Sequence, residues 1–154
     1  MTRSVIALIV VGLSATSAEA QGSGCTYDTC ALRLRTRFLS SPSIVQGHEG
    51  RRVAKIGMFG SRVDVLAGGS DSVRTHYEAF RHHQNSGGAL TLISALAGGV
   101  AGALAGHNYE ANKTAVWSAV GVGLVFTIWG EAHLASGNDH LQQSIWFYNR
   151  DLPR

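Results

Sequence analysis

Two long uncharged segments in the second half of the chain limit what it can fold into. No charged residue occurs from Ala89 to Ala105 or from Thr114 to Gly130, and a short polar stretch, 107–113, lies between the apolar runs. At a rise of about 1.5 Å per residue, each segment forms a helix of about 25 Å, which approaches the hydrocarbon thickness of a bilayer. The pair therefore predicts a two-helix transmembrane hairpin over residues 87–134.

A soluble helix pair is the alternative interpretation, because a single run of this length also occurs in core helices. Such a domain would be exported, would be soluble or peripheral, and would bind an apolar ligand between its two apolar helices. With 154 residues we expect one domain, which leaves little other chain to cover both helices. We therefore favour insertion into a lipid bilayer.

Small residues recur every four positions on both apolar segments. The expected helix-packing residues are Gly98, Gly102 and Gly106 on the first segment and Ala115, Ala119 and Gly123 on the second. Helices in lipid associate through close backbone approach, which small residues permit, so the two rows are expected to face each other. The row from Gly98 to Gly106 also resembles glycine-zipper segments of bacterial envelope proteins. Contact with a second copy, in a homo-oligomer, or with another membrane protein is therefore the alternative use of this row.

The first twenty residues have the three parts of a secretory signal peptide. Arg3 gives a positive start, Val5 to Leu13 form an apolar core, and Ala18 to Ala20 form a small-residue cleavage site. We expect residues 1–20 to be removed, so that the mature chain begins at Gln21; retention as an anchor is the alternative. Export predicts a membrane location in the cell envelope, with the N-terminal segment and the C-terminal tail on the exported side.

Cys25 and Cys30 are the two cysteines of the chain. Exported proteins reach an oxidising compartment, where two nearby thiols usually pair, so we expect a disulfide. A metal site is the alternative interpretation. Two thiolates supply only half of the ligands of a structural zinc site, however, and the chain has no second cysteine pair.

Basic residues alternate with apolar ones from Leu32 to Phe38, which predicts a half-buried strand with one basic face. Arg33, Arg35 and Arg37 form this face, and Arg51 and Arg52 follow nearby in the sequence. Anionic lipid headgroups would suit such a face, and a solvated outer surface is the alternative. Nucleic acid is not an expected partner, because the segment is expected to be exported.

Turn residues divide the rest of the exported segment. Pro42 is expected to end the first strand, and the glycine-bounded loop 47–50 is expected to join the two strands of a hairpin. Residues 63–66 predict another extended piece. A helix is expected to begin near Asp71, where apolar residues start to recur with helical spacing.

Two clusters of turn-favouring residues, Asn85–Gly88 and Ser136–Asn138, are expected to interrupt the helices on either side of the hairpin. The second interruption would start a last helix within 135–154. One face of that helix is apolar: Leu141, Ile145 and Tyr148. An amphipathic helix next to a membrane span is expected to lie at the membrane interface.

The usual catalytic signatures are absent, including Gly-x-Ser-x-Gly, His-Glu-x-x-His and phosphate-binding glycine loops. We expect no cofactor, and a catalytic activity is less expected than a structural one. A polar cluster of Glu131, His133 and His140 is the alternative, as a metal or proton site in a membrane enzyme. His82 and His83 are expected to be solvated at a helix end.

These features together predict an α+β, mostly helical fold. Its expected parts are a signal peptide, 1–20, an exported segment with short strands and one helix, 21–86, a two-helix membrane hairpin, 87–134, and a C-terminal interfacial amphipathic helix, 135–154. The expected function is that of a small bacterial-type envelope integral membrane protein with a structural or protein-interaction role.

Overall fold

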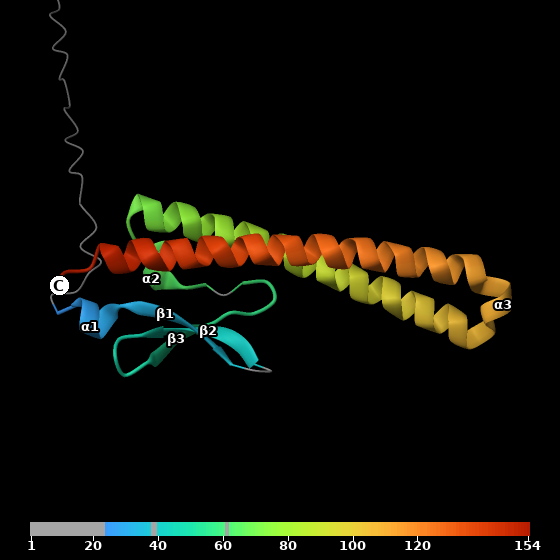
Figure 1. Ribbon diagram of the computed structural model, residues 1–154, viewed down its shortest axis with the longest axis horizontal. Coiled ribbons are helices and arrows are strands. Elements are labelled where there is room, and N and C mark those ends of the chain that lie inside the picture. The colour runs from blue at the N-terminus through green and yellow to red at the C-terminus, as the bar shows by residue number, and fades with distance from the viewer. Residues whose placement is uncertain (1–23, 38–39, 61) are drawn as a thin grey trace, which may run out of the picture.

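The computed structural model describes residues 24–37, 40–60 and 62–154 of the chain. The fold is α+β and mostly helical, as the sequence predicts, with a small antiparallel sheet beside one end of a long helix (Figure 1). In chain order the elements are α1 (Tyr27–Cys30), β1 (Leu32–Arg37), β2 (Ser40–Gln46), β3 (Arg51–Lys55), α2 (Asp64–Ala67) and α3 (Asp71–Arg150). The expected signal peptide lies outside the described residues.

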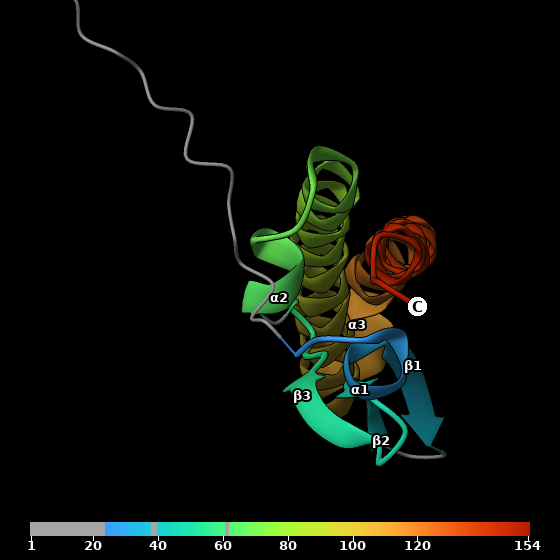
Figure 2. The same ribbon diagram turned by 90° about the vertical axis from the view of Figure 1, so that its left-hand side faces the viewer.

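The sheet has the strand order β1-β2-β3, and both neighbouring pairs are antiparallel. Leu32 and Ile44 are buried, whereas Arg33 and Arg35 are exposed. Figure 2, which looks along α3, shows both halves of that helix above the same side of the sheet. The alternation expected in β1 is therefore confirmed as far as Arg35, and Phe38 lies outside the described residues.

The hairpin of β2 and β3 also forms as expected, around the loop 47–50. Gly47 and Gly50 both have a φ of 67°, a backbone conformation that residues other than glycine rarely adopt. The glycines at the two ends of this loop therefore fix the turn.

Pro42 lies inside β2, so the prediction that it ends a strand was wrong. The register of β1 against β2 shifts between Arg35 and Arg37, opposite the part of β2 that contains Pro42. Proline is tolerated at such an irregularity, because no regular ladder hydrogen bond is needed from its nitrogen. Its carbonyl still accepts a hydrogen bond from Ile56 N over 2.7 Å.

Residues 63–66 are not extended as expected, because Asp64–Ala67 form the one-turn helix α2. In so short a stretch, apolar spacing does not distinguish a strand from a helical turn. The turn buries Leu66 completely, and Val63 N donates a hydrogen bond to the Tyr77 hydroxyl over 2.6 Å. Helix α2 therefore closes one side of the core.

Helix α3 is a single element of 80 residues in which Asn108 alone leaves helical geometry, with φ −161° and ψ 94°. The chain reverses there, so that 71–107 and 109–150 run antiparallel side by side (Figures 1 and 2). We call these the first arm and the second arm. Asn108 caps the second arm, since its side-chain oxygen accepts a hydrogen bond from Ala111 N over 3.2 Å.

Residues spaced by seven line the contact between the arms, and we call this line the seam. They are Val73, Phe80, Gly87, Ser94 and Ala101 on the first arm and Val116, Gly123, Gly130, Gly137 and Ser144 on the second. Ser144 Oγ donates to Val73 O over 3.0 Å, and Ser94 Oγ donates to Gly123 O over 2.8 Å. A repeat of seven is the period with which helices wind around each other in a left-handed coiled coil.

Glycines at the seam serve close approach and do not break the helix. A Cβ atom at Gly87 would lie 3.0 Å from Gly130 O, and one at the neighbouring Gly88 would lie 2.6 Å from Met58 O. Glycine costs about 1 kcal/mol relative to alanine inside a helix, but no larger residue fits at these contacts. The expected interruptions at Asn85–Gly88 and Ser136–Asn138 are therefore absent.

The main core lies between the sheet, α2 and the end of α3 at which the chain enters and leaves that helix. We call this end of α3, residues 71–88 and 130–150, the base, and residues 89–129 the distal part. Leu141, Ile145 and Tyr148 are buried in this core with 0%, 8% and 7% exposure. The expectation that they form an interfacial face is therefore wrong, because the sheet and the first arm already cover them.

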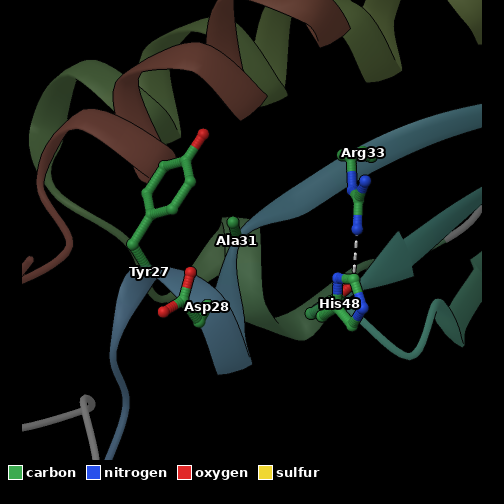
Figure 3. Close-up of a pocket in the computed structure, with 6 residues that line it drawn as sticks. Tyr27, Asp28, Ala31, Arg33 and His48 are labelled. Carbon is green, nitrogen blue, oxygen red and sulfur yellow. Dashed lines mark hydrogen bonds between the residues drawn. The ribbon is translucent and has the colours of Figure 1, made fainter.

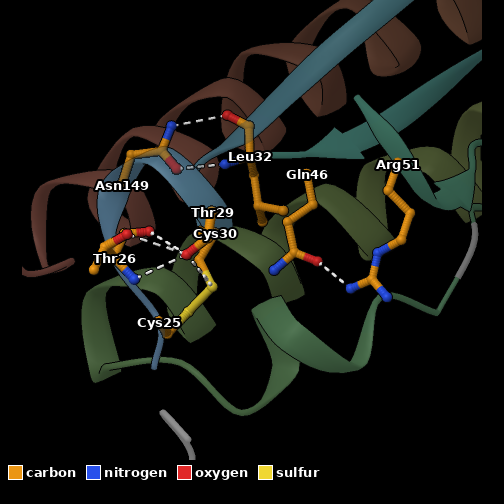
Figure 4. The surroundings of a disulfide bond; sticks show 8 residues. All are labelled: Cys25, Thr26, Thr29, Cys30, Leu32, Gln46, Arg51 and Asn149. Atoms are coloured by element: carbon orange, nitrogen blue, oxygen red, sulfur yellow. Dashed lines mark hydrogen bonds between the residues drawn. A yellow bond between two sulfur atoms is a disulfide. The ribbon is translucent and has the colours of Figure 1, made fainter. Parts of the chain in front are cut away.

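The end of α3 is also fastened to the start of the sheet. Asn149 accepts a hydrogen bond from Leu32 N over 2.7 Å and donates one to Leu32 O over 2.8 Å (Figure 4). The expected disulfide is present and joins Cys25, which precedes α1, to Cys30, the last residue of α1. Tyr27 N donates to Pro153 O over 3.0 Å, so both ends of the described chain meet beside the base.

Candidate functional site

The distal part of α3 presents large apolar side chains to the outside on both arms. Leu96 is 63% exposed on the first arm, and Leu124 and Ile128 are 59% and 71% exposed on the second. Helix α3 is long and apolar enough to cross a membrane, and only 11% of its most apolar stretch is buried. A core helix of a soluble protein would bury most of such a stretch, so this surface is the first candidate functional site.

Further apolar side chains stand at the edge of this surface, on the loop that follows β3. Met58 and Phe59 are 52% and 53% exposed, and the Phe59 ring packs within contact distance of Gly88. Gln84 Nε2 donates to Gly57 O and Met58 O over 3.1 and 3.3 Å, which fixes the loop to the first arm. The two side chains therefore stand where the base gives way to the uncharged part of the arm.

Polar residues return at the tip of the arms. Glu110 and Lys113 are exposed there, and Trp117 Nε1 donates to the Tyr109 hydroxyl over 3.2 Å. The aromatic pair lies beside the charged tip, as amphipathic rings do where a membrane meets water. The apolar surface is thus bounded by polar residues at both ends.

Four histidines meet across the arms at the base, and we call them the histidine ladder. They are His76 and His83 on the first arm and His133 and His140 on the second. The Nδ1 atoms of His76 and His140 are 3.3 Å apart, and those of His83 and His133 are 3.1 Å apart. The rings of His83 and His140 stack with centroids 5.5 Å apart, so the two pairs form one continuous row.

Aromatic rings close both ends of the ladder. Phe147 stacks on His76 with centroids 5.2 Å apart, and the Trp129 ring lies 6.3 Å from that of His133. At the Phe147 end, the Arg150 guanidinium carbon lies 4.8 Å from the centre of the Phe147 ring. The rings leave the ladder partly buried and restrict the rotation of its terminal histidines.

The ladder lowers the pKa of His83. Burial contributes most, and the charges that His133, His140 and His82 would carry add to the effect. Each of these causes disfavours the imidazolium form. His83 is therefore held in the neutral form, with nitrogen lone pairs available, at lower pH than an isolated histidine.

The structure brings together two of the three residues of the expected polar cluster. His133 and His140 lie in the ladder, whereas Glu131 is exposed, and no contact among the described residues joins it to either histidine. Their partners across the arms, His76 and His83, were not predicted from the sequence. The spacing could have indicated them, because the two ladder histidines of each arm are seven residues apart, which is the period of the seam.

The expected glycine row does not pack between the arms. A Cβ atom at Gly98, Gly102 or Gly106 would meet nothing within 4 Å. Of the residues expected opposite, Ala115 is exposed and Ala119 half-buried, whereas Gly123 is buried against Ser94 and Ala97. The second arm contacts positions that recur every seven residues along the first arm. Residues spaced by four do not stay on that line, so the row from Gly98 to Gly106 faces outward.

Two of the shallow pockets formed by the described residues lie on the sheet. Tyr27, Asp28, Ala31, Arg33, Gly47 and His48 line one of about 200 Å³, in which Arg33 donates to Gly47 O over 2.8 Å (Figure 3). Small-molecule sites usually measure about 300–1,000 Å³, so we assign no ligand to it. The other pocket, of about 360 Å³, lies on the outer face of the sheet.

This outer pocket is basic. Arg35, Arg52 and Lys55 line it together with Ser41 and Ser43, and no acidic residue does. The strand register places Ser43 beside both Arg35 and Lys55, which aligns the two cations across the sheet. The arrangement suits a surface anion.

Comparison of the chain with protein-family models, with curated proteins and with solved structures finds no match.

Proposed function

We propose that the protein is a small integral membrane protein of a bacterial-type cell envelope, with a structural or protein-interaction role. In this proposal the two arms of α3 form a transmembrane hairpin and hold the sheet and the base at one membrane surface. The observation that carries it is the exposure of large apolar side chains on both arms, from Leu92 to Trp129, along stretches without a charged residue.

The geometry of the arms supports a membrane rather than an apolar ligand. The arms touch along the seam, where Gly130 and Gly87 leave no room even for a methyl group without movement. Exposed apolar side chains such as Leu96 and Ile128 point away from the seam. An apolar partner would therefore surround the pair of arms, as lipid chains do, and would not enter between them.

The chain topology is that expected of a hairpin with its other elements on one side of a membrane. The base, the sheet and the C-terminus lie together at one end of α3, and the charged tip with Glu110 and Lys113 lies at the other (Figure 1). Met58 and Phe59 would meet the bilayer at the near surface, beside Gly88. The exported side follows from the expected signal peptide, which places the sheet outside the cytoplasm.

Leu124→Arg tests the proposal, with Gln143→Arg as the matched control. Both side chains are exposed on the second arm, but Leu124 lies in the distal part and Gln143 in the base. A charge near the middle of a membrane helix costs about 2.5–3.5 kcal/mol of insertion free energy, whereas a surface charge in water costs little. Leu124→Arg should therefore reduce the carbonate-resistant membrane fraction, and Gln143→Arg should leave it unchanged.

The opposite outcome would end the proposal. If the wild-type chain is extracted by carbonate, or if Leu124→Arg leaves membrane retention as in the wild type, the arms do not cross a bilayer. The exposed apolar surface would then have to be covered by protein, and chemical crosslinking would show whether a second copy covers it.

A further inference from the structure

We propose that the histidine ladder is a metal site, in which the pair His76–His140 and the pair His83–His133 each bind one divalent transition-metal ion. The inference concerns the base alone and does not depend on the arms crossing a membrane. Its ligands come from opposite arms, so each ion would join the two arms.

The distances within the pairs fit shared coordination. With metal–nitrogen bonds of about 2.0–2.1 Å in tetrahedral geometry, two imidazole nitrogens on one ion stand about 3.3 Å apart. The paired Nδ1 atoms are 3.3 Å apart in His76–His140 and 3.1 Å apart in His83–His133. Both pairs therefore already have nearly the separation that an ion requires.

The packing around the ladder holds the four rings in place for binding. Phe147 stacks against His76 at one end, and Trp129 lies beside His133 at the other. Between them, the backbone of the second arm comes close to the first, since a Cβ atom at Gly137 would lie 3.3 Å from the Cβ atom of His83. A site with pre-positioned ligands binds an ion without first ordering its side chains.

The ligand set selects the class of ion. Neutral imidazole suits Zn²⁺, Cu²⁺ and Ni²⁺, whereas Mg²⁺ and Ca²⁺ prefer oxygen ligands. Both cysteines are held in the disulfide, so no thiolate competes for the metal. No group of three or more histidine, cysteine, aspartate or glutamate side chains among the described residues is arranged to hold a metal, so water would complete each two-histidine site. Such sites bind less tightly than closed structural zinc sites and release the ion to a chelator.

The test is calorimetric titration of the full chain, purified in detergent without a polyhistidine tag and stripped of metal with EDTA. We expect two Zn²⁺ ions per wild-type chain, no heat of binding with Mg²⁺, and a rise in the thermal unfolding midpoint on adding Zn²⁺. The double variant His83→Gln/His140→Gln removes one ligand from each pair and should lose both the binding and the rise. His48→Gln/His107→Gln removes two histidines outside the ladder and should retain both.

Single variants keep the test decisive if the double variant fails to fold. His76→Gln should reduce the stoichiometry from two ions to one, and His133→Gln should do the same, because each damages one pair only. Absence of Zn²⁺ binding by the folded wild-type chain would overturn the proposal, as would binding that persists in the double variant. A single ion per wild-type chain, lost in either single variant, would overturn the assignment of two separate pairs.

Discussion

The base and the distal part of α3 share one seam but differ in everything that surrounds it. In the base, the residues beside the seam are histidines and core residues, and the sheet covers one side of the arms. In the distal part, the residues beside the seam are apolar and exposed, and among the described residues each arm packs mainly against the other. The seven-residue repeat therefore determines how the arms contact each other. The outward-facing residues determine what surrounds the base and the distal part.

Helix contact and solvent preference are encoded at different positions. Gly87 and Gly130 would permit the same close approach in water or in lipid, because both lie at the contact itself. Leu96 and Ile128 decide which solvent the distal part can meet. Substitutions at the seam should therefore affect both parts alike, and outward substitutions should affect only one.

The largest effect is expected from Gly87→Val. Its added side chain would meet Leu134 at 2.8 Å and the backbone oxygen of Gly130 at 3.0 Å, so the arms have to separate. Overpacking of this kind costs about 1–3 kcal/mol, and we expect the upper end because a backbone atom cannot turn aside. Thermal unfolding in detergent measures the loss.

Gly102→Val is the matched control for Gly87→Val, because it adds the same side chain to the same arm where nothing lies within 4 Å. We expect its stability to stay within about 0.5 kcal/mol of the wild type. Equal losses in the two variants would show that the outward row packs as closely as the seam.

A smaller effect is expected from Asn149→Ala, which acts only on the base. The change removes two hydrogen bonds to Leu32 and leaves both of its backbone groups without that partner, at a cost of about 2 kcal/mol. Asn138→Ala, at an exposed position of the same arm, should change stability by less than about 0.5 kcal/mol. Hydrogen exchange should show faster opening of β1 in Asn149→Ala, while the distal part keeps its protection.

The smallest effect expected is a dependence of the base on pH in the absence of metal. The folded chain lowers the pKa of His83, so the unfolded chain binds the proton first as pH falls below about 6.5. The contribution of His83 is therefore fully present above that pH and is lost as pH falls through its lowered folded pKa. Unfolding midpoints at pH 7.5 and 5.5, measured with EDTA, should differ less in His83→Gln than in the wild type. An equal difference in both chains would assign the pH dependence to other groups.

Much of the fold could be predicted because local patterns determine it. The alternation in β1, the glycines of the loop 47–50 and the start of α3 at Asp71 each follow from a few neighbouring residues. The disulfide follows from the closeness of Cys25 and Cys30 in the sequence together with the expected export. These features need no knowledge of distant contacts.

The predictions from sequence were wrong where contacts between distant residues determine the structure. Gly87 and Gly137 favour helix ends by propensity, but the opposite arm requires the space they leave, and the helix continues through both. The row from Gly98 to Gly106 gives a clear local repeat, yet the longer repeat of seven sets the contact. The histidine ladder was missed for the same reason, since its pairs join residues 50 and 64 positions apart.

The way in which α3 returns to the sheet has a consequence for the order of events during synthesis. The core beneath the sheet is completed by Leu141 and Tyr148, which lie beyond both apolar segments. The strands leave the ribosome first. They lack this part of their core until the second arm has been synthesised and has packed against the sheet. Contacts between residues so far apart in sequence form slowly, so the sheet should stay exposed to proteases and chaperones until then. A chain truncated after the first arm should therefore leave its strands unfolded.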